Sequence, residues 1–148
     1  MILKQTDSTD TDFTALAREL EAELKIRDGD DHLFYAGLNK IGKLDHVVVA
    51  FKENDAAGCG GLVPYSNTKM EIKRMYVKPS YRKLSVATEI LSALEDWARA
   101  LRFSTCVLET GKNQPEAIAF YTKNGYSIIP NFGKYEGSPN SVCFAKNL

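Results

Sequence analysis

Residues 71–91 read EIKRMYVKPSYRKLSVATEIL and join a strand pattern to a helix pattern through one short turn. A strand is expected from Lys69 to Val77, and Pro79 closes it. A helix start with basic residues can hold an anion such as phosphate, because its first N–H groups lack partners. It is equally typical of an ordinary charged surface. The helix itself is expected from Arg82 to Arg102, where one apolar stripe recurs at helical spacing: Leu84, Ala87, Ile90, Leu91, Leu94, Trp97, Ala98 and Leu101.

The strand expected over residues 69–77 changes its alternation half-way. Apolar residues occupy even positions up to Ile72 and odd positions from Met75. Because a strand alternates with a period of two, one extra residue in a β-bulge would produce this change. Alternatively, Lys73 or Arg74 lays its stem on the core while its charged head reaches water. The pattern leaves both explanations open.

The remaining segments predict a mixed sheet with further helices. A helix from about Asp12 to Ile26 follows capping Asp and Thr residues, and Gly29 ends it. A later helix starts at Pro115 and ends near Gly125. A short amphipathic piece is expected at 33–38, and further strands at 2–5, 46–51, 58–63, 105–108, 127–129 and 141–145. The strands before and after the long helix should pair in parallel through a right-handed crossover.

Composition excludes several classes of protein. The chain has 148 residues, 44% of them hydrophobic, which predicts a single domain over residues 1–148. Its 19 basic and 19 acidic side chains cancel, which argues against a nucleic-acid binder. No stretch approaches the ~20 apolar residues of a membrane span, so we expect no membrane association and a cytoplasmic location. The three cysteines lie in apolar runs, which predicts buried free thiols and no metal site: Cys59, Cys106 and Cys143.

Two blocks of the sequence together resemble a known family. Residues 71–91 are similar to the acetyl-CoA-binding motif of the GNAT superfamily of N-acetyltransferases, in which a strand ending in apolar-x-Val leads to Arg/Gln-x-x-Gly-x-Gly/Ala at a helix start. Residues 109–126, ETGKNQPEAIAFYTKNGY, resemble the family's later helical motif, Ala-x-x-aromatic-Tyr-x-x-x-Gly-aromatic. The resemblance implies an α/β fold. Its mixed, mostly antiparallel sheet has six to seven strands, helices on both faces and a splayed central parallel pair.

The resemblance implies acetyl-CoA as the acyl donor. In the family its pyrophosphate lies on backbone amides that match Arg82, Lys83, Leu84, Ser85, Val86 and Ala87 here. Its pantetheine arm adds to the splayed strand edge, which matches the backbone of Met75, Tyr76 and Val77. Gln114 stands where an Asn is frequent, so an amide contact is expected there. Ser85 stands where the family prefers Gly, but we expect this helix-start position to need no positive φ.

The resemblance also implies direct attack of an amine on the thioester in a ternary complex. Tyr121 matches the family's general acid, and a phenol pKa of ~10 suits an alkyl thiol. A backbone N–H near Met75 would stabilise the oxyanion. Glu71 resembles the strand-borne carboxylate that removes the amine proton through water, although a half-exposed Glu on a strand is also typical of plain surface. The acceptor is an amine, either a small molecule or a peptide, and a homodimer is left open.

The charges are unevenly distributed along the chain. Residues 1–31 carry nine acids and four bases, whereas residues 69–83 carry six bases and one acid. In the resembled fold the N-terminal helices border the acceptor side. An acidic rim there would attract a cationic acceptor such as a polyamine, a lysine-like amine or a basic peptide end. Ordinary charged helix surface is the competing explanation for Glu19, Glu21 and Glu23.

Two other functions stay open from the sequence. The first is a regulator of the same fold that binds acyl-CoA without turnover, for which Ser85 is the one hint. The second is a structural or dimerisation domain that binds no CoA. Binding of CoA separates the second from the others, and thiol release with a set of amines separates the first from an enzyme.

Overall fold

The strands of the protein form one mixed sheet. The computed structural model describes residues 1–29 and 42–148, and these form a seven-stranded sheet of order β1-β2-β3-β4-β5-β7-β6. β4 and β5 run parallel, whereas all other neighbours are antiparallel. The predicted sheet is therefore confirmed. Its strands are β1 (Ile2–Thr6), β2 (His46–Lys52), β3 (Asp55–Pro64), β4 (Lys69–Val77), β5 (Thr105–Gly111), β6 (Ser127–Ile129) and β7 (Ser141–Asn147).

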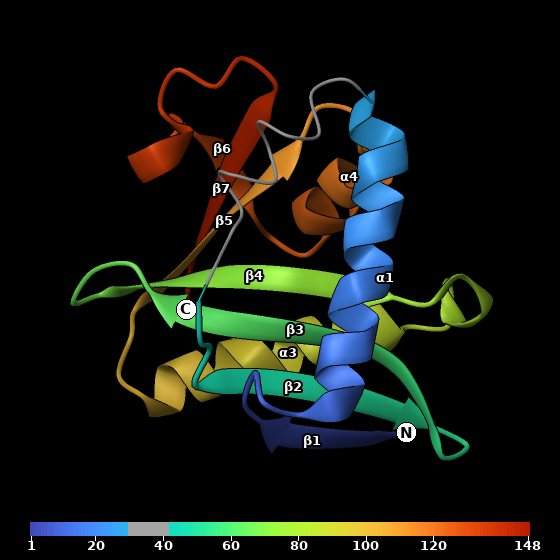
Figure 1. The fold of residues 1–148 in the computed structure, drawn as a ribbon. Helices are drawn as coiled ribbons and strands as arrows, with labels where there is room; N and C mark the ends of the chain where they lie inside the picture. Colours follow the sequence, from blue (N-terminus) through green and yellow to red (C-terminus); the bar gives the residue numbers. More distant parts are fainter. Residues whose placement is uncertain (30–41) are drawn as a thin grey trace.

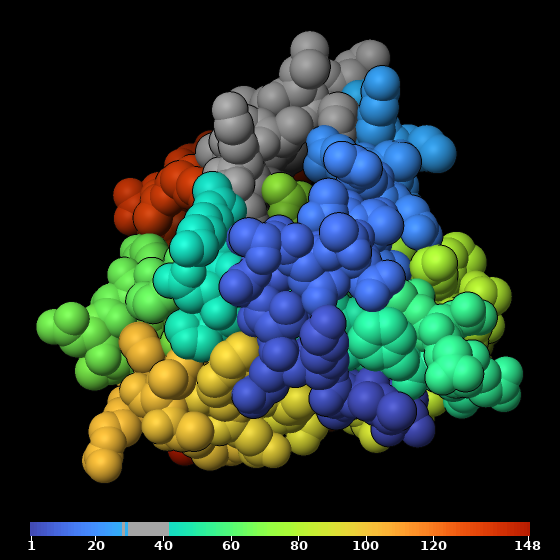
Figure 2. Space-filling model, turned by 60° about the horizontal axis from the view of Figure 1, so that its bottom comes forward, coloured from blue at the N-terminus to red at the C-terminus, as the bar shows by residue number. Residues whose placement is uncertain are grey.

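Helices cover both faces of this sheet, as predicted. They are α1 (Thr11–Asp28), α3 (Val86–Ala100) and α4 (Pro115–Lys123), with 3-10 turns at η2 (Pro79–Tyr81) and η3 (Gly133–Tyr135). α1 crosses in front of β2, β3 and β4, and α3 lies behind them (Figure 1). The space-filling view shows the blue atoms of β1 and α1 through the middle of the visible face, with the yellow atoms of α3 below (Figure 2). In the described ranges, no helix has the length and apolar character needed to cross a bilayer.

A separate apolar core lies on each face of the sheet. The α1 core contains Phe13, Leu16, Leu20, Leu44, Val47, Val49, Cys59 and Tyr76. The larger core on the other face joins α3 and α4 to the strands, and it includes Met70, Ile72, Ile90, Leu94, Leu108, Tyr121 and Phe144. All three cysteines are buried, as predicted. The piece expected at 33–38 lies outside the described residues.

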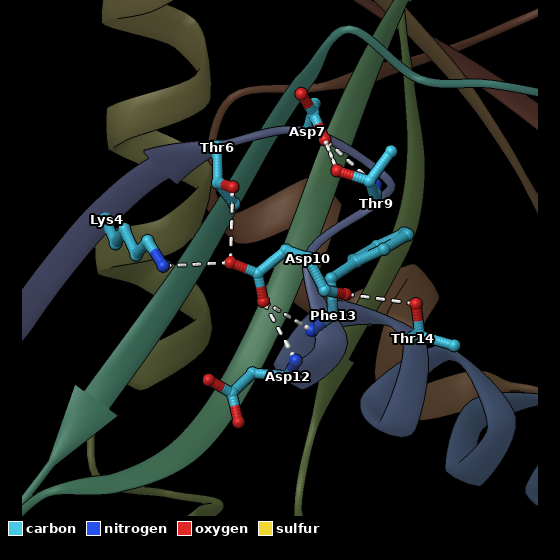
Figure 3. Close-up of polar contacts among 8 residues, drawn as sticks. All are labelled: Lys4, Thr6, Asp7, Thr9, Asp10, Asp12, Phe13 and Thr14. Atoms are coloured by element: carbon cyan, nitrogen blue, oxygen red, sulfur yellow. Dashed lines mark hydrogen bonds and ion pairs between the residues drawn. The ribbon is translucent and has the colours of Figure 1, made fainter.

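Asp10 fixes the start of α1, and Figure 3 shows its contacts. Its Oδ1 accepts hydrogen bonds from the N–H groups of Asp12 (2.9 Å) and Phe13 (3.1 Å). Its Oδ2 accepts from Lys4 Nζ (3.0 Å) and Thr6 Oγ1 (3.2 Å). Burial raises the pKa of this carboxyl, but these hydrogen bonds outweigh burial and hold the pKa below its ordinary value. The cap confirms that the predicted Asp and Thr residues start the helix.

The change of alternation in β4 is a β-bulge. Between two regular pairs of the β3–β4 ladder, Arg74 and Met75 together lie opposite the single residue Gly60. Arg74 takes a left-handed conformation with φ of 58°, which turns the strand at this point. The competing explanation was that Lys73 or Arg74 reaches water with its charged head. It is wrong for Lys73, because the whole side chain is only 6% exposed.

β4 and β5 separate soon after they meet, and the separation is visible in Figure 1. Their parallel ladder has three pairs and ends where Glu71 lies beside Val107. β4 continues to Val77 and β5 to Gly111 without pairing to each other. The splayed parallel pair expected from the resemblance is therefore confirmed, and the bulge lies on its β4 arm.

We predict that Gly60→Ala destabilises the protein. A Cβ at Gly60 would lie 2.5 Å from Met75 Sδ and 2.8 Å from a Leu94 methyl group, so these side chains must shift within the packed core. Overpacking of this kind lowers the free energy of unfolding by about 1–3 kcal/mol. Urea unfolding measures the change. Gly42→Ala is the matched control, because a Cβ at Gly42 meets nothing within 4 Å. Equal stability of the two variants would contradict the prediction.

Candidate active site

The separation of β4 and β5 leaves a cavity of about 130 Å³ between them. Leu20 and Leu24 of α1 close it on one face, and Ala117 and Tyr121 of α4 close it on the other. The described residues that line it are 20, 24, 72–75, 108–114, 117, 121 and 140. Three of the predicted site residues are therefore in its wall: Met75, Gln114 and Tyr121.

Tyr121 brings a hydroxyl to the cavity from α4. Its ring is buried, and ring centroids lie 5.7 Å from Tyr126 and 6.1 Å from Phe144. No group in the described part of the chain forms a hydrogen bond with the hydroxyl, which borders the cavity instead. Burial raises the pKa of this phenol above its ordinary value. The hydroxyl therefore keeps its proton near neutral pH and can donate it to a group in the cavity.

The turn between β4 and α3 corrects the expectation for Ser85. The helix expected from Arg82 begins at Val86, and both Lys83 (φ 64°) and Ser85 (φ 66°) are left-handed. The expectation that position 85 needs no positive φ was therefore wrong. Alternating left-handed and ordinary residues turn successive N–H groups toward one side and form an anion-binding nest. The unpartnered N–H groups of the first turn of α3 follow directly.

Arg82 is bonded within the protein. Its Nε donates to the Val77 carbonyl (2.8 Å), and its Nη2 donates to Glu23 of α1 (2.7 Å). Its backbone N–H is directed at the Pro79 carbonyl (3.3 Å). These bonds tie the turn to both β4 and α1. The N–H groups beyond Arg82 are then the ones that can receive an anion.

The acidic run of α1 faces the basic run of β4 and the following turn. Three ion pairs join them: Glu19–Lys78 (3.8 Å), Glu21–Arg74 (3.7 Å) and Glu23–Arg82 (2.7 Å). These glutamates are therefore partly exposed residues, 30–43% by side chain, that are paired with cations of the same protein. Three of the nine acids in residues 1–31 are thus paired with three of the six bases in residues 69–83. Asp30 and Asp31 of the acidic run lie outside the described residues.

Glu71 is buried in a polar cluster, not half-exposed as expected. It is only 7% exposed because η3 brings Tyr135 over this part of β4. Tyr135 donates its hydroxyl proton to Glu71 Oε2 (3.0 Å), and Lys73 Nζ donates to the same hydroxyl oxygen (2.7 Å). Lys73 Nζ also lies 3.5 Å from Glu71 Oε2. Lys73 lines the cavity, whereas Glu71 is not among the described residues of its wall.

Lys73 and Glu109 face each other across the opening. Each stands two residues beyond the last parallel pair of its strand. Their neighbours Ile72 and Leu108 point into the α3 core, so alternation directs Lys73 and Glu109 to the α1 face. Glu109 Oε2 accepts a hydrogen bond from Ser141 Oγ of β7 (2.7 Å). Glu109 thus brings a carboxylate to the cavity from the face opposite α4.

Comparison with known proteins places this arrangement in a family. The sequence model described as the acetyltransferase (GNAT) family matches residues 12–126. The chain belongs to the GNAT acetyltransferase family. An IAA acetyltransferase of Azospirillum brasilense is 35% identical over 113 residues, which is 75% of this chain and 74% of that protein.

Solved structures show the same fold as this GNAT acetyltransferase. A Klebsiella pneumoniae protein whose crystal structure carries the name acyl-CoA N-acyltransferase is 31% identical, with a TM-score of 0.83 over 99% of this chain and 97% of that one. A GNAT acetyltransferase of Elizabethkingia anophelis with acetyl-CoA bound has a TM-score of 0.69 at 18% identity, over 99% of this chain and 97% of that one.

The sequence did not reveal two residues of the cavity wall, Glu109 and Lys73, or Tyr135 of the polar cluster beside them. Glu109 had a signal, since it is a charge directly after the apolar run 105–108 and opens the second motif. Lys73 also had one, since it stands at the break of alternation. Tyr135 had none, because it lies in a loop rich in Pro and Gly and meets β4 only through the fold.

We predict that Ser85→Gly stabilises this acetyltransferase. A left-handed residue with a Cβ is strained, and glycine removes that strain while adding some entropy to the unfolded chain. The balance raises the free energy of unfolding by up to about 1 kcal/mol. Ser85→Ala, which keeps the Cβ, should give no gain. Urea unfolding of both variants checks this, and an equal gain from alanine would show that the backbone strain is not the cause.

Proposed function

We propose that this GNAT acetyltransferase moves an acetyl group from acetyl-CoA to the nitrogen of an amine, by direct attack with both substrates bound. The observation that carries the proposal is the Tyr121 hydroxyl, a proton donor fixed by a buried ring in the wall of the cavity. The alternative, a regulator that binds acyl-CoA without turnover, gives this donor no task.

The residues present fit acetyl-CoA. The left-handed Lys83 and Ser85 and the N-terminus of α3 form a nest for phosphate oxygens. Beyond Glu71, no strand of the described residues lies along the β5-facing edge of β4, so this edge can receive an extended pantetheine arm. Met75 and Gln114 border the cavity that the arm would enter. The other predicted contacts lie along the same path: Tyr76, Val77, Arg82, Leu84, Val86 and Ala87.

Tyr121 is the proposed general acid. Acetyl-CoA supplies an acetyl thioester, whose sulfur needs a proton when the carbon–sulfur bond breaks. Tyr121 holds that proton on the α4 side of the cavity, and its raised pKa keeps the phenol protonated. The N–H of Met75, one of the two residues of the bulge, is the proposed donor to the developing oxyanion.

The proposed base is Glu109, with Glu71 as the candidate to test beside it. A general base must reach the proton that it abstracts, directly or through one water. Glu109 lines the cavity on the α1 face, whereas Glu71 is held by Tyr135 in the buried cluster. The amine would then lose its proton on one face of the opening while Tyr121 gives a proton on the other.

Release of free CoA thiol with a panel of amines tests the function. The panel contains alkyl amines, amino acids, polyamines and short peptides, and mass spectrometry identifies the acetylated product. No release with any acceptor would contradict the proposal. If acetyl-CoA still raised the melting temperature in that case, the regulator would be supported instead.

In the same assay we predict that Tyr121→Phe lowers kcat by about 10²-fold. The Kd for acetyl-CoA should stay nearly unchanged, because only a hydroxyl is lost. Since burial raises the pKa of Tyr121, kcat of the wild type should not fall as pH approaches ~10, where an ordinary tyrosine ionises. Tyr65→Phe, at an exposed residue, is the matched control. Equal kcat for the two variants would remove Tyr121 from the mechanism.

We further predict that Glu109→Gln lowers kcat/KM for a protonated amine by about 10²–10³-fold at pH 7. Without a base, the variant depends on amine that is already neutral, so its kcat/KM should rise about tenfold per pH unit below the amine's own pKa. Glu71→Gln should keep the pH profile of the wild type.

Glu136→Gln, at an exposed residue of the late loop, controls for the substitution itself. A steep pH profile for Glu71→Gln, together with a wild-type profile for Glu109→Gln, would assign the base to Glu71 as predicted from the sequence.

A further inference from the structure

Lys73 is a buried cation that borders the cavity. Its side chain is 6% exposed, yet it forms part of the cavity wall. An ammonium group has three N–H donors. In the described part of the chain, one of these donors forms a hydrogen bond with the Tyr135 hydroxyl. Glu71 Oε2 lies 3.5 Å from Nζ and forms an ion pair with it, without a hydrogen bond. The ammonium therefore has donor capacity left, and it belongs to a residue of the cavity wall.

This donor capacity indicates an anionic ligand. A buried charge is unfavourable unless it is paired and hydrogen-bonded, and burial lowers the pKa of Lys73. A carboxylate that enters the cavity would supply the missing acceptor. The phosphates of CoA are not the natural source of this anion. Their proposed nest at Ser85 follows the end of β4 at Val77. Lys73 lies at the other end of the opening, two residues beyond the last pair of β4 and β5.

Charges of both signs face the α1 side of the cavity. Glu109 stands across from Lys73, and Lys112 adds a further cation to the wall. An acceptor with a positive charge alone would meet Glu109 but would be repelled by Lys73. An acceptor with one ammonium and one carboxylate group can match both.

We infer that the acceptor is an amine that also carries a carboxylate, an amino-acid-like molecule whose carboxylate binds Lys73 and whose nitrogen binds beside Glu109. The inference rests on the proposed function and names its substrate class. The nitrogen binds as an ammonium and first loses one proton through Glu109 to solvent, which frees its electron pair for attack on the thioester carbon. As the new carbon–nitrogen bond forms, the nitrogen gives a second proton to Glu109. The carbon–sulfur bond breaks, and its electron pair leaves with the sulfur, which takes a proton from Tyr121. Lys73 takes part in no bond change and determines specificity.

The test compares acceptors that differ only by a carboxylate. Leucine is compared with isoamylamine, and alanine with ethylamine, each amine being the decarboxylated form of the amino acid. The wild type should have a kcat/KM at least about tenfold higher for the amino acid in one or both pairs, a factor typical of one charged hydrogen bond. Lys73→Met should reduce that ratio by about 10–100-fold, mainly through KM of the amino acid.

Lys134→Met is the matched control. Lys134 is exposed and its Nζ lies 5.6 Å from the centroid of the Tyr135 ring, so it borders the cluster without being a described residue of the cavity wall. In Lys134→Met, the ratio of kcat/KM for the amino acid to kcat/KM for the plain amine should equal that of the wild type. A general loss of activity in Lys73→Met would lower both acceptors together and leave the ratio unchanged, so the ratio separates recognition from structural damage.

A binding measurement covers the case in which Lys73→Met folds poorly because Glu71 loses its ion partner. The double variant Lys73→Met, Glu71→Gln removes both charges. Calorimetry with CoA-loaded protein then measures the Kd for isocaproate, which is leucine without its amine. The wild type should bind isocaproate, and the double variant should bind it at least about tenfold more weakly.

Equal or higher kcat/KM for the plain amine in both pairs, or an unchanged ratio in Lys73→Met, would overturn the inference while the proposed function stands. Unchanged binding of isocaproate to the double variant would overturn it as well. No CoA release with any acceptor would contradict the proposed function itself, and the inference with it.

Discussion

The early end of the parallel ladder between β4 and β5 is the constraint on which the rest of the structure depends. The two strands pair only up to Glu71 and Val107, so both continue into the protein without each other's hydrogen bonds. The bulge turns β4 through the left-handed Arg74, and α4 occupies the space on one face of the opening. Backbone groups that lose a strand partner must be satisfied in another way. An opening between two central strands is therefore suited to an extended ligand that takes the place of a strand.

The two faces of the sheet contribute to the opening by different physical means. On the α4 face, Tyr121 lies in the wall of the cavity and is fixed by apolar packing. On the α1 face, the wall is held by polar contacts, with Tyr135 bridging Lys73 and Glu71. A buried ion pair loses much of its attraction to desolvation, and an apolar substitute is often as stable. The presence of the pair at this position therefore favours a role in recognition over a role in stability. The ion pairs of α1 are largely exposed, so each contributes little stability, but together they orient the helix over the cavity.

The sequence predicted the fold well because most of its elements have local causes. The parity change in β4 indicated the bulge, and the Asp and Thr residues before α1 indicated its cap. The strand bounds of β4 and the start of α4 at Pro115 agree with the prediction. The exposure of Glu71 could not be predicted, because it depends on a tyrosine from a distant loop. The same holds for the acidic run of α1, whose glutamates found partners on β4 and the following turn. Ser85 was misjudged for a local reason, since the helix begins at Val86 and leaves Ser85 in the turn.

Three left-handed residues show that the fold tolerates backbone strain at both ends of one segment, which runs from the bulge of β4 to the start of α3. Arg74 lies in the bulge, and Lys83 and Ser85 lie in the turn that follows β4. Each carries a Cβ in a conformation that favours glycine, which is disfavoured by roughly 1–2 kcal/mol. Such residues persist where the surrounding structure determines them, and they cluster at ligand sites. The proposed phosphate nest lies at one end, and the strand edge beside the cavity lies at the other. The distance between the two ends is set by one continuous segment, the last part of β4 and the turn that follows it. An extended ligand that reaches both ends must therefore match the length of this segment.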